Sequence, residues 1–138
     1  MDFLTRILLE KEKEIENLTA VQTVKTKVRP SFYHIVKEQP KKMHVIGEIK
    51  RASPSKGVIN ENVDILQQAR SYEAAGVSAI SVLTDPVFFK GEINDLAAVA
   101  QVVDVPVLCK DFIIDKRQLD RAKQAGASIV LLLSLIHI

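Results

Sequence analysis

The chain has 138 residues, of which 47% are hydrophobic and 26% are charged, with a formal net charge of +2 at pH 7. This composition is typical of one ordinary globular domain. A net charge so near zero gives no strongly basic face, so we expect no nucleic acid partner. The single cysteine, Cys109, excludes an internal disulfide, and no apolar run approaches the ~20 residues that span a bilayer. We therefore expect a cytoplasmic protein with no membrane partner.

Two helices are predicted before the first strand. Residues 1–18 place apolar side chains mostly three, four or seven positions apart, with Lys and Glu between them. This pattern indicates an amphipathic helix that packs on a protein surface; the balanced charges of its polar face disfavour the alternative, a membrane helix. Ser31 is predicted to cap a short helix at about 31–38. We treat residues 1–42 as an N-terminal helical extension.

From residue 43 to 138 the pattern alternates strands and helices. Strands that are nearly all apolar, joined by short connections, indicate an α/β fold with a parallel sheet covered by helices. Right-handed βα units close into a barrel or spread into an open doubly wound sheet. The predicted strands are 43–50, 78–83, 105–110 and one from Ser128 through Leu133; the predicted helices are about 63–75, 93–102 and 115–125, with Gly76 and Gly126 just past two of them.

Two lysines, Lys50 and Lys110, close two of the predicted strands. In a barrel of βα units the carboxyl ends of the strands form the active face. Side chains alternate along a strand, so Glu48 and Lys50 share a face and can form an ion pair. That pair is either a structural salt bridge or a carboxylate that orients a lysine toward an anionic substrate. Lys110 could donate a proton.

The loops after these strands supply further candidates. Residues 53–57 carry two hydroxyl groups, an amine and a glycine, which suits a site for a carboxylate or phosphate, although a solvated turn is the alternative. Phe89 and Phe112 follow the second and third strands and either cover an aromatic substrate or anchor their loops. Cys109 points away from Lys110 and is predicted to be buried in packing.

Several segments, in this order, resemble the indole-3-glycerol phosphate synthase family. They are VIGEIKRASPSKG at 45–57, SVLTD at 81–85, FFKG at 88–91 and PVLCKDFIID at 106–115. AKQAGASIVLLL at 122–133 and RPSF at 29–32 fit as well, so the resemblance covers nearly the whole chain to about Leu133. It implies the (β/α)8 TIM barrel of an enzyme of tryptophan biosynthesis. Such a barrel takes roughly 250 residues, so we expect residues 43–138 to form its first half, three βα units and a fourth strand.

The resemblance also implies a reaction. The phosphorylated small-molecule substrate would be 1-(2-carboxyphenylamino)-1-deoxyribulose 5-phosphate, which undergoes ring closure, decarboxylation and dehydration without a metal or organic cofactor. By this analogy Lys110 is the general acid, and Lys50, held by Glu48, binds substrate anions. The substrate-binding residues implied are Ser53 for the anthranilate carboxylate, and Phe89, Phe112 and Leu83 around the aromatic ring.

Two departures from the family pattern bear on stability and activity. Gly47 stands where the family more often has alanine, which we expect to cost some stability. The family's general base and phosphate-binding loops belong to later strands, so we expect a truncated chain that is inactive alone. Its inner face, with Ile46, Leu83 and Leu108, would lie open to water and promote self-association.

Two alternatives to an enzymatic role in this family stay open. One is a non-catalytic, self-associating barrel fragment. The other is a different phosphate-binding barrel, such as phosphoribosylanthranilate isomerase, which the EIKRASPSKG run at 48–57 disfavours.

Overall fold

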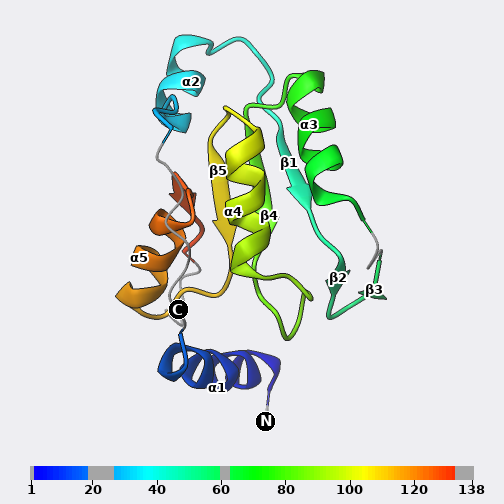
Figure 1. Cartoon of the computed structure of the whole chain (residues 1–138), viewed down its shortest axis with the longest axis vertical. Helices are drawn as coiled ribbons and strands as arrows, with labels where there is room; N and C mark the ends of the chain where they lie inside the picture. Colours follow the sequence, from blue (N-terminus) through cyan, green and yellow to red (C-terminus); the bar gives the residue numbers. More distant parts are fainter. Residues whose placement is uncertain (1, 19–26, 60–62, 133–138) are drawn as a thin grey trace.

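A four-stranded parallel sheet forms the centre of the molecule in the computed structural model, which describes residues 2–18, 27–59 and 63–132 (Figure 1). The strands lie side by side in chain order, as successive βα units of a barrel place them, whereas a doubly wound sheet reverses its order at a switch point. The strands of this sheet are β1 (Ile46–Ile49), β4 (Ala79–Leu83), β5 (Val107–Lys110) and β6 (Ile129–Val130).

Helices α3 (Ile65–Ala75) and α4 (Ile93–Val102) pack on one face of this sheet, and α5 (Lys116–Gln124) follows β5 (Figure 1). Every second strand side chain points toward the helices. These side chains build the hydrophobic core with the buried faces of α3 and α4. The core includes Ile49, Ile80, Val82, Val107, Cys109, Ala69, Leu96, Val99 and Ala100.

The opposite, inner face of the sheet carries the side chains that alternate with the core positions. Glu48 pairs in register with Ser81, and Leu83 pairs with Lys110. The expectation that this face lies open to water is correct at Ile46, which is 46% exposed, but wrong at Leu83, which is 4% exposed. Ile46 lies on the edge strand β1 and Leu83 on the interior strand β4, whereas Leu108, on the interior strand β5, is half-buried.

The two helices before the sheet lie at its opposite ends. Helix α1 (Phe3–Glu16) crosses the carboxyl end of the strands, and α2 (Phe32–Glu38) lies toward their amino ends (Figure 1). The guanidinium group of Arg29, just before α2, donates hydrogen bonds to backbone carbonyls at the end of α4 and the start of β5. None of the described helices is long and apolar enough to cross a membrane.

The predicted helices are confirmed with small shifts at their ends, and α4 has the predicted bounds. Strands β1, β5 and β6 are shorter than predicted, β6 ending at Val130. Ser31 is the N-cap residue of α2, as predicted, but its side chain makes no capping hydrogen bond; its carbonyl accepts from the Ile35 amide. The end of the fourth predicted strand, Leu133, lies outside the described residues.

The expectation that Gly47 costs stability is wrong, because the Tyr72 ring of α3 occupies the space of a side chain there. A methyl group on Gly47 would lie 2.6 Å from a ring carbon of Tyr72. The Tyr72 hydroxyl donates to the Glu48 carbonyl at 3.0 Å. The glycine thus allows α3 to pack closely against β1, next to Glu48 of the candidate site.

Candidate active site

One carboxylate, that of Glu48, contacts two lysines at the carboxyl end of the sheet. Its Oε1 lies 2.6 Å from Nζ of Lys110, and its Oε2 lies 3.5 Å from Nζ of Lys50. The predicted Glu48–Lys50 pair is therefore present, but the shorter contact is to the other lysine. About a third of each of these three side chains remains exposed, so the cluster is accessible to a ligand.

The register of the sheet explains how residues 62 positions apart meet. Glu48 lies on β1 and Lys110 ends β5, with β4 between them. Ser81 of β4 pairs in register with Glu48, and its small side chain leaves space over the sheet for the longer side chains on either side. The Ser81 hydroxyl is buried and has no hydrogen-bond partner among the described residues.

Aromatic rings from two loops meet beside this end of the sheet. The Phe89 and Phe112 ring centroids are 6.0 Å apart, and Phe88 lies 6.4 Å from Phe112 in an edge-on arrangement. Phe3 of α1 extends the row, 5.4 Å from Phe88. The two phenylalanines predicted to surround an aromatic substrate are thus brought together, although their contact with one another also anchors their loops.

The loop after β1 is more structured than predicted. It forms a hairpin of β2 (Ala52–Ser53) and β3 (Gly57–Val58). Ser53 is 8% exposed, and its hydroxyl accepts a hydrogen bond from the Lys56 amide at 3.2 Å, so it closes the turn in this structure.

Arg51 anchors this hairpin to the start of α4. Its guanidinium group binds both carboxylate oxygens of Asp95, one of them at 3.1 Å. The hydrogen bond to Asp95 raises the pKa of Arg51 above its ordinary value, which exceeds the opposing effect of burial. Asp95 also accepts from the amide of Glu92 in a capping box. The hairpin that carries Ser53 is therefore fixed at one end by a bidentate ion pair.

A buried ion cluster, missed from the sequence, lies between α1 and the strand ends. Lys11 is 0% exposed; its Nζ binds Asp85, lies 2.8 Å from Asp111 and lies 3.0 Å from Glu14. Burial alone lowers the pKa of Lys11, but Asp111 and Asp85 outweigh it and raise the pKa above its ordinary value. The signal in the sequence was a lysine on an apolar helix face, four residues from both Ile7 and Ile15.

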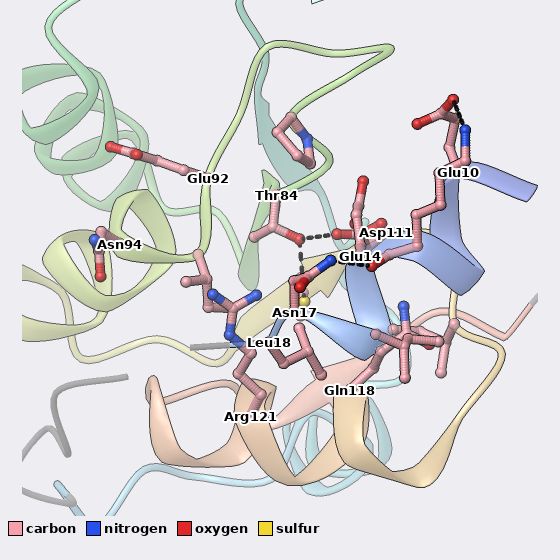
Figure 2. A pocket seen from close by; sticks show the side chains of 16 residues that line it. Glu10, Glu14, Asn17, Leu18, Thr84, Glu92, Asn94, Asp111, Gln118 and Arg121 are labelled. Carbon is pink, nitrogen blue, oxygen red and sulfur yellow. Dashed lines mark hydrogen bonds and ion pairs between the residues drawn. The ribbon is translucent and has the colours of Figure 1, made fainter. Parts of the chain in front are cut away.

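A cavity of about 520 Å³ lies beside this cluster (Figure 2). It is bordered by α1, the start of α4 and α5, and it includes Thr84, Asp111 and Arg121. The residues lining it do not include Glu48, Lys50 or Lys110. The cavity therefore lies apart from the ion cluster that the sequence predicted.

Cys109 is buried, as predicted, and faces the core. Burial raises the pKa of its thiol to about 11 from an ordinary value of 9.0. The raised pKa favours the protonated thiol at neutral pH, which argues against a nucleophilic role.

The comparisons with known proteins agree with this architecture. The family model described as indole-3-glycerol phosphate synthase matches residues 4–136. The chain belongs to this family. Its members are TIM barrels, and the sequential parallel sheet of this structure is consistent with four successive strands of such a barrel.

Curated relatives with the same family name are similar along nearly all of the chain. An indole-3-glycerol phosphate synthase of Listeria welshimeri is 54% identical over 133 residues, covering 96% of this chain and 53% of the relative. One from Lactococcus lactis is 50% identical over 131 residues, covering 95% of this chain and 50% of the relative. The chain thus spans about half the length of the curated relatives it matches.

Proposed function

We propose that this chain supplies one side of the active site of an indole-3-glycerol phosphate synthase. The reaction is ring closure, decarboxylation and dehydration of 1-(2-carboxyphenylamino)-1-deoxyribulose 5-phosphate, as expected from the sequence. The observation that carries the proposal is the contact of Glu48 with both Lys50 and Lys110 at the carboxyl end of a parallel sheet.

In this proposal Lys110 is the general acid. Ring closure places negative charge on the former carbonyl oxygen of the substrate, and a proton donated from Nζ of Lys110 neutralises it. Dehydration requires the same oxygen, now a hydroxyl group, to accept a second proton and leave as water. One lysine can serve both steps when its amine regains a proton from solvent between them. The carboxylate of Glu48, 2.6 Å away, keeps the ammonium group at one place on the inner face of the sheet.

Lys50 then has a separate task, which is to bind a substrate anion. Its ammonium group is held less closely by Glu48, at 3.5 Å, and can turn toward a carboxylate or phosphate. Ser53 and the hairpin around it would contact the substrate carboxylate. Phe89 and Phe112 would enclose the aromatic ring, with Leu83 below it.

The expectations on cofactors, location and nucleic acid stay predictions. The residues proposed here act through proton transfer and charge, so the chemistry assigned to them involves no metal or organic cofactor. We infer a cytoplasmic location and no nucleic acid partner, as the composition indicates.

A fusion protein tests the proposal. Residues 1–132 would be joined to the part of the Listeria welshimeri relative that follows the residue aligned with Leu132, and product formation would be followed by the appearance of indole fluorescence. We expect conversion of the substrate named above and no isomerisation of phosphoribosylanthranilate. A folded fusion that forms no indole-3-glycerol phosphate, while the intact relative does, would refute the proposal.

A further inference from the structure

We propose that Lys11 in α1 is a positioning residue that holds together the two loops carrying Phe89 and Phe112. This inference deepens the proposed function and rests on it, since the spacing of these loops affects the reaction only if the substrate ring binds there. It gives the helical extension a defined task at the carboxyl end of the sheet.

The burial of Lys11 shows that it does not serve as a surface charge. It is 0% exposed, and lysine is almost never fully buried unless it is paired. Its partners come from three places: Glu14 of α1, Asp85 after β4, and Asp111 after β5. One ammonium group therefore connects the extension with two different loops of the sheet.

Each of the two loop carboxylates in turn binds backbone amides of its own loop. Asp85 accepts hydrogen bonds from the amides of Phe88, at 2.5 Å, and Phe89, at 3.1 Å. Asp111 accepts from the amide of Phe112 at 2.7 Å. The position of each aromatic residue thus depends on a carboxylate that Lys11 holds.

The loops are also connected to each other through Asp111. The Thr84 hydroxyl, at the start of the first loop, donates to Asp111 at 2.7 Å (Figure 2). Asp111 directly follows Lys110, the proposed general acid. A shift of Asp111 would therefore act on the aromatic pair through Phe112, whereas the ammonium group of Lys110 is held by Glu48.

The positive charge of Lys11 holds the two loop carboxylates together. Asp85 is 0% exposed and Asp111 has a side chain only 14% exposed, so the two carboxylates would repel one another with little screening if the ammonium group were absent. Lys11 also lies over the Phe112 ring, with its Nζ 5.8 Å from the ring centroid. Loss of Lys11 is therefore expected to separate the two loops.

Hydrogen exchange on the unaltered 138-residue chain tests whether the loops depend on α1. If Lys11 holds them, the amides of Phe88, Phe89 and Phe112 exchange in the same opening event as the amides of α1, as one cooperative unit. Strand amides would exchange more slowly. One example is the amide of Ile80, which donates to the Pro106 carbonyl. Loop amides that stay protected while α1 exchanges would overturn the inference.

A pair of lysine variants in the fusion protein tests the consequence for the reaction. We expect Lys11→Met to raise KM by about tenfold and to change kcat by less than about threefold, because substrate binding between the rings is weakened. Lys13→Met is the matched control, since this side chain is 70% exposed on the same helix and should leave both constants unchanged. Restored KM in Lys11→Arg would show that the buried charge is what matters.

The outcomes separate this inference from the proposed function. An unchanged KM in a folded Lys11→Met protein would overturn the positioning role, as would equal changes in both lysine variants. If the fusion is inactive before any substitution, the proposed function fails while the exchange measurement still decides whether Lys11 holds the loops. The same measurement decides the matter if Lys11→Met does not fold.

Discussion

Two lysine clusters at the same end of the sheet differ in what they contribute to stability. The side chains around Glu48 are about a third exposed, and ion pairs near the surface are worth only ~0–1 kcal/mol. Lys11 and Asp85 are fully buried, and breaking a buried pair by removing one partner costs about 3–5 kcal/mol. Lys11 is therefore expected to contribute more to stability than Lys50 and Lys110. The partial exposure of Lys50 and Lys110 suits contact with a ligand.

At the same scale, Cys109 predicts how stability changes in alkaline solution. Its thiol pKa is raised from 9.0 to about 11 in the folded protein because the folded state disfavours the thiolate. The stability due to this group is present below pH 9 and is lost as the pH rises through about 11. The loss is about 2–3 kcal/mol at ~1.4 kcal/mol for each unit of pKa.

Urea unfolding of the chain and of Cys109→Ala from pH 8 to pH 11 measures this effect. We expect the free energy of unfolding to fall more steeply with pH in the unaltered chain, because alanine has no proton to lose. The raised pKa of Lys11 is present in both proteins, so its effect on stability cancels in the difference. Equal slopes would show that the thiol does not contribute.

At the scale of elements, two glycines at helix ends give a matched pair of predictions. Gly126 and Gly76 both have positive φ, 106° and 92°. A Cβ at Gly126 would lie 2.7 Å from the Cβ of Ala100 in α4, whereas a Cβ at Gly76 meets no atom within 4 Å. Gly76→Ala should cost about 1–2 kcal/mol from the left-handed backbone alone, and Gly126→Ala a further ~1–3 kcal/mol from overpacking against α4.

Denaturant midpoints of the two variants check this difference. The slope of the unfolding transition should match that of the unaltered chain, so that the midpoints report stability. Equal destabilisation of the two variants would mean that α4 and the end of α5 are not in close contact at Ala100.

The elements were predicted well where local signals agree. Helix α4 begins at the expected residue, where Glu92 and Asp95 form a capping box. The hairpin of β2 and β3 was missed because its strands have two residues each, too few to show alternation. Gly47 was misjudged because its reason lies in Tyr72, a contact between elements that no local pattern contains.

The site was predictable only in part, for the same reason. The Glu48–Lys50 contact follows from the period of two within one strand. The Glu48–Lys110 contact depends on the order and register of β1, β4 and β5, which the sequence does not state. Lys11 had a helical signal for burial, but two of its three partners, Asp85 and Asp111, lie 74 and 100 positions away in loops.

At the scale of the whole molecule, the described sheet has two edges. Within the described residues β1 and β6 each pair with one strand only. Near the β1 edge Met43 is 84% exposed, Val45 is 51% exposed and Ile46 is 46% exposed. Unpaired strands bordered by apolar side chains promote association with another chain. We predict that the 138-residue polypeptide, produced alone, associates with itself.

Sedimentation measures this association at tens of micromolar, about the concentration at which such surfaces aggregate. Ile46→Lys should weaken it, because a lysine on an edge strand hinders pairing. Lys41→Arg, an exposed position outside the strand, serves as the control. Sedimentation as a compact monomer at this concentration would contradict the prediction.

The central claim is that Lys110 donates the proton in the reaction, and the turnover number of the fusion protein with Lys110→Met tests it most directly. General acid catalysis contributes ~10²–10⁴-fold, so we predict that kcat falls by about this factor while KM changes far less. Lys123→Met, an exposed lysine of α5, is the control and should keep full activity. An unchanged kcat in a folded Lys110→Met protein would contradict the account.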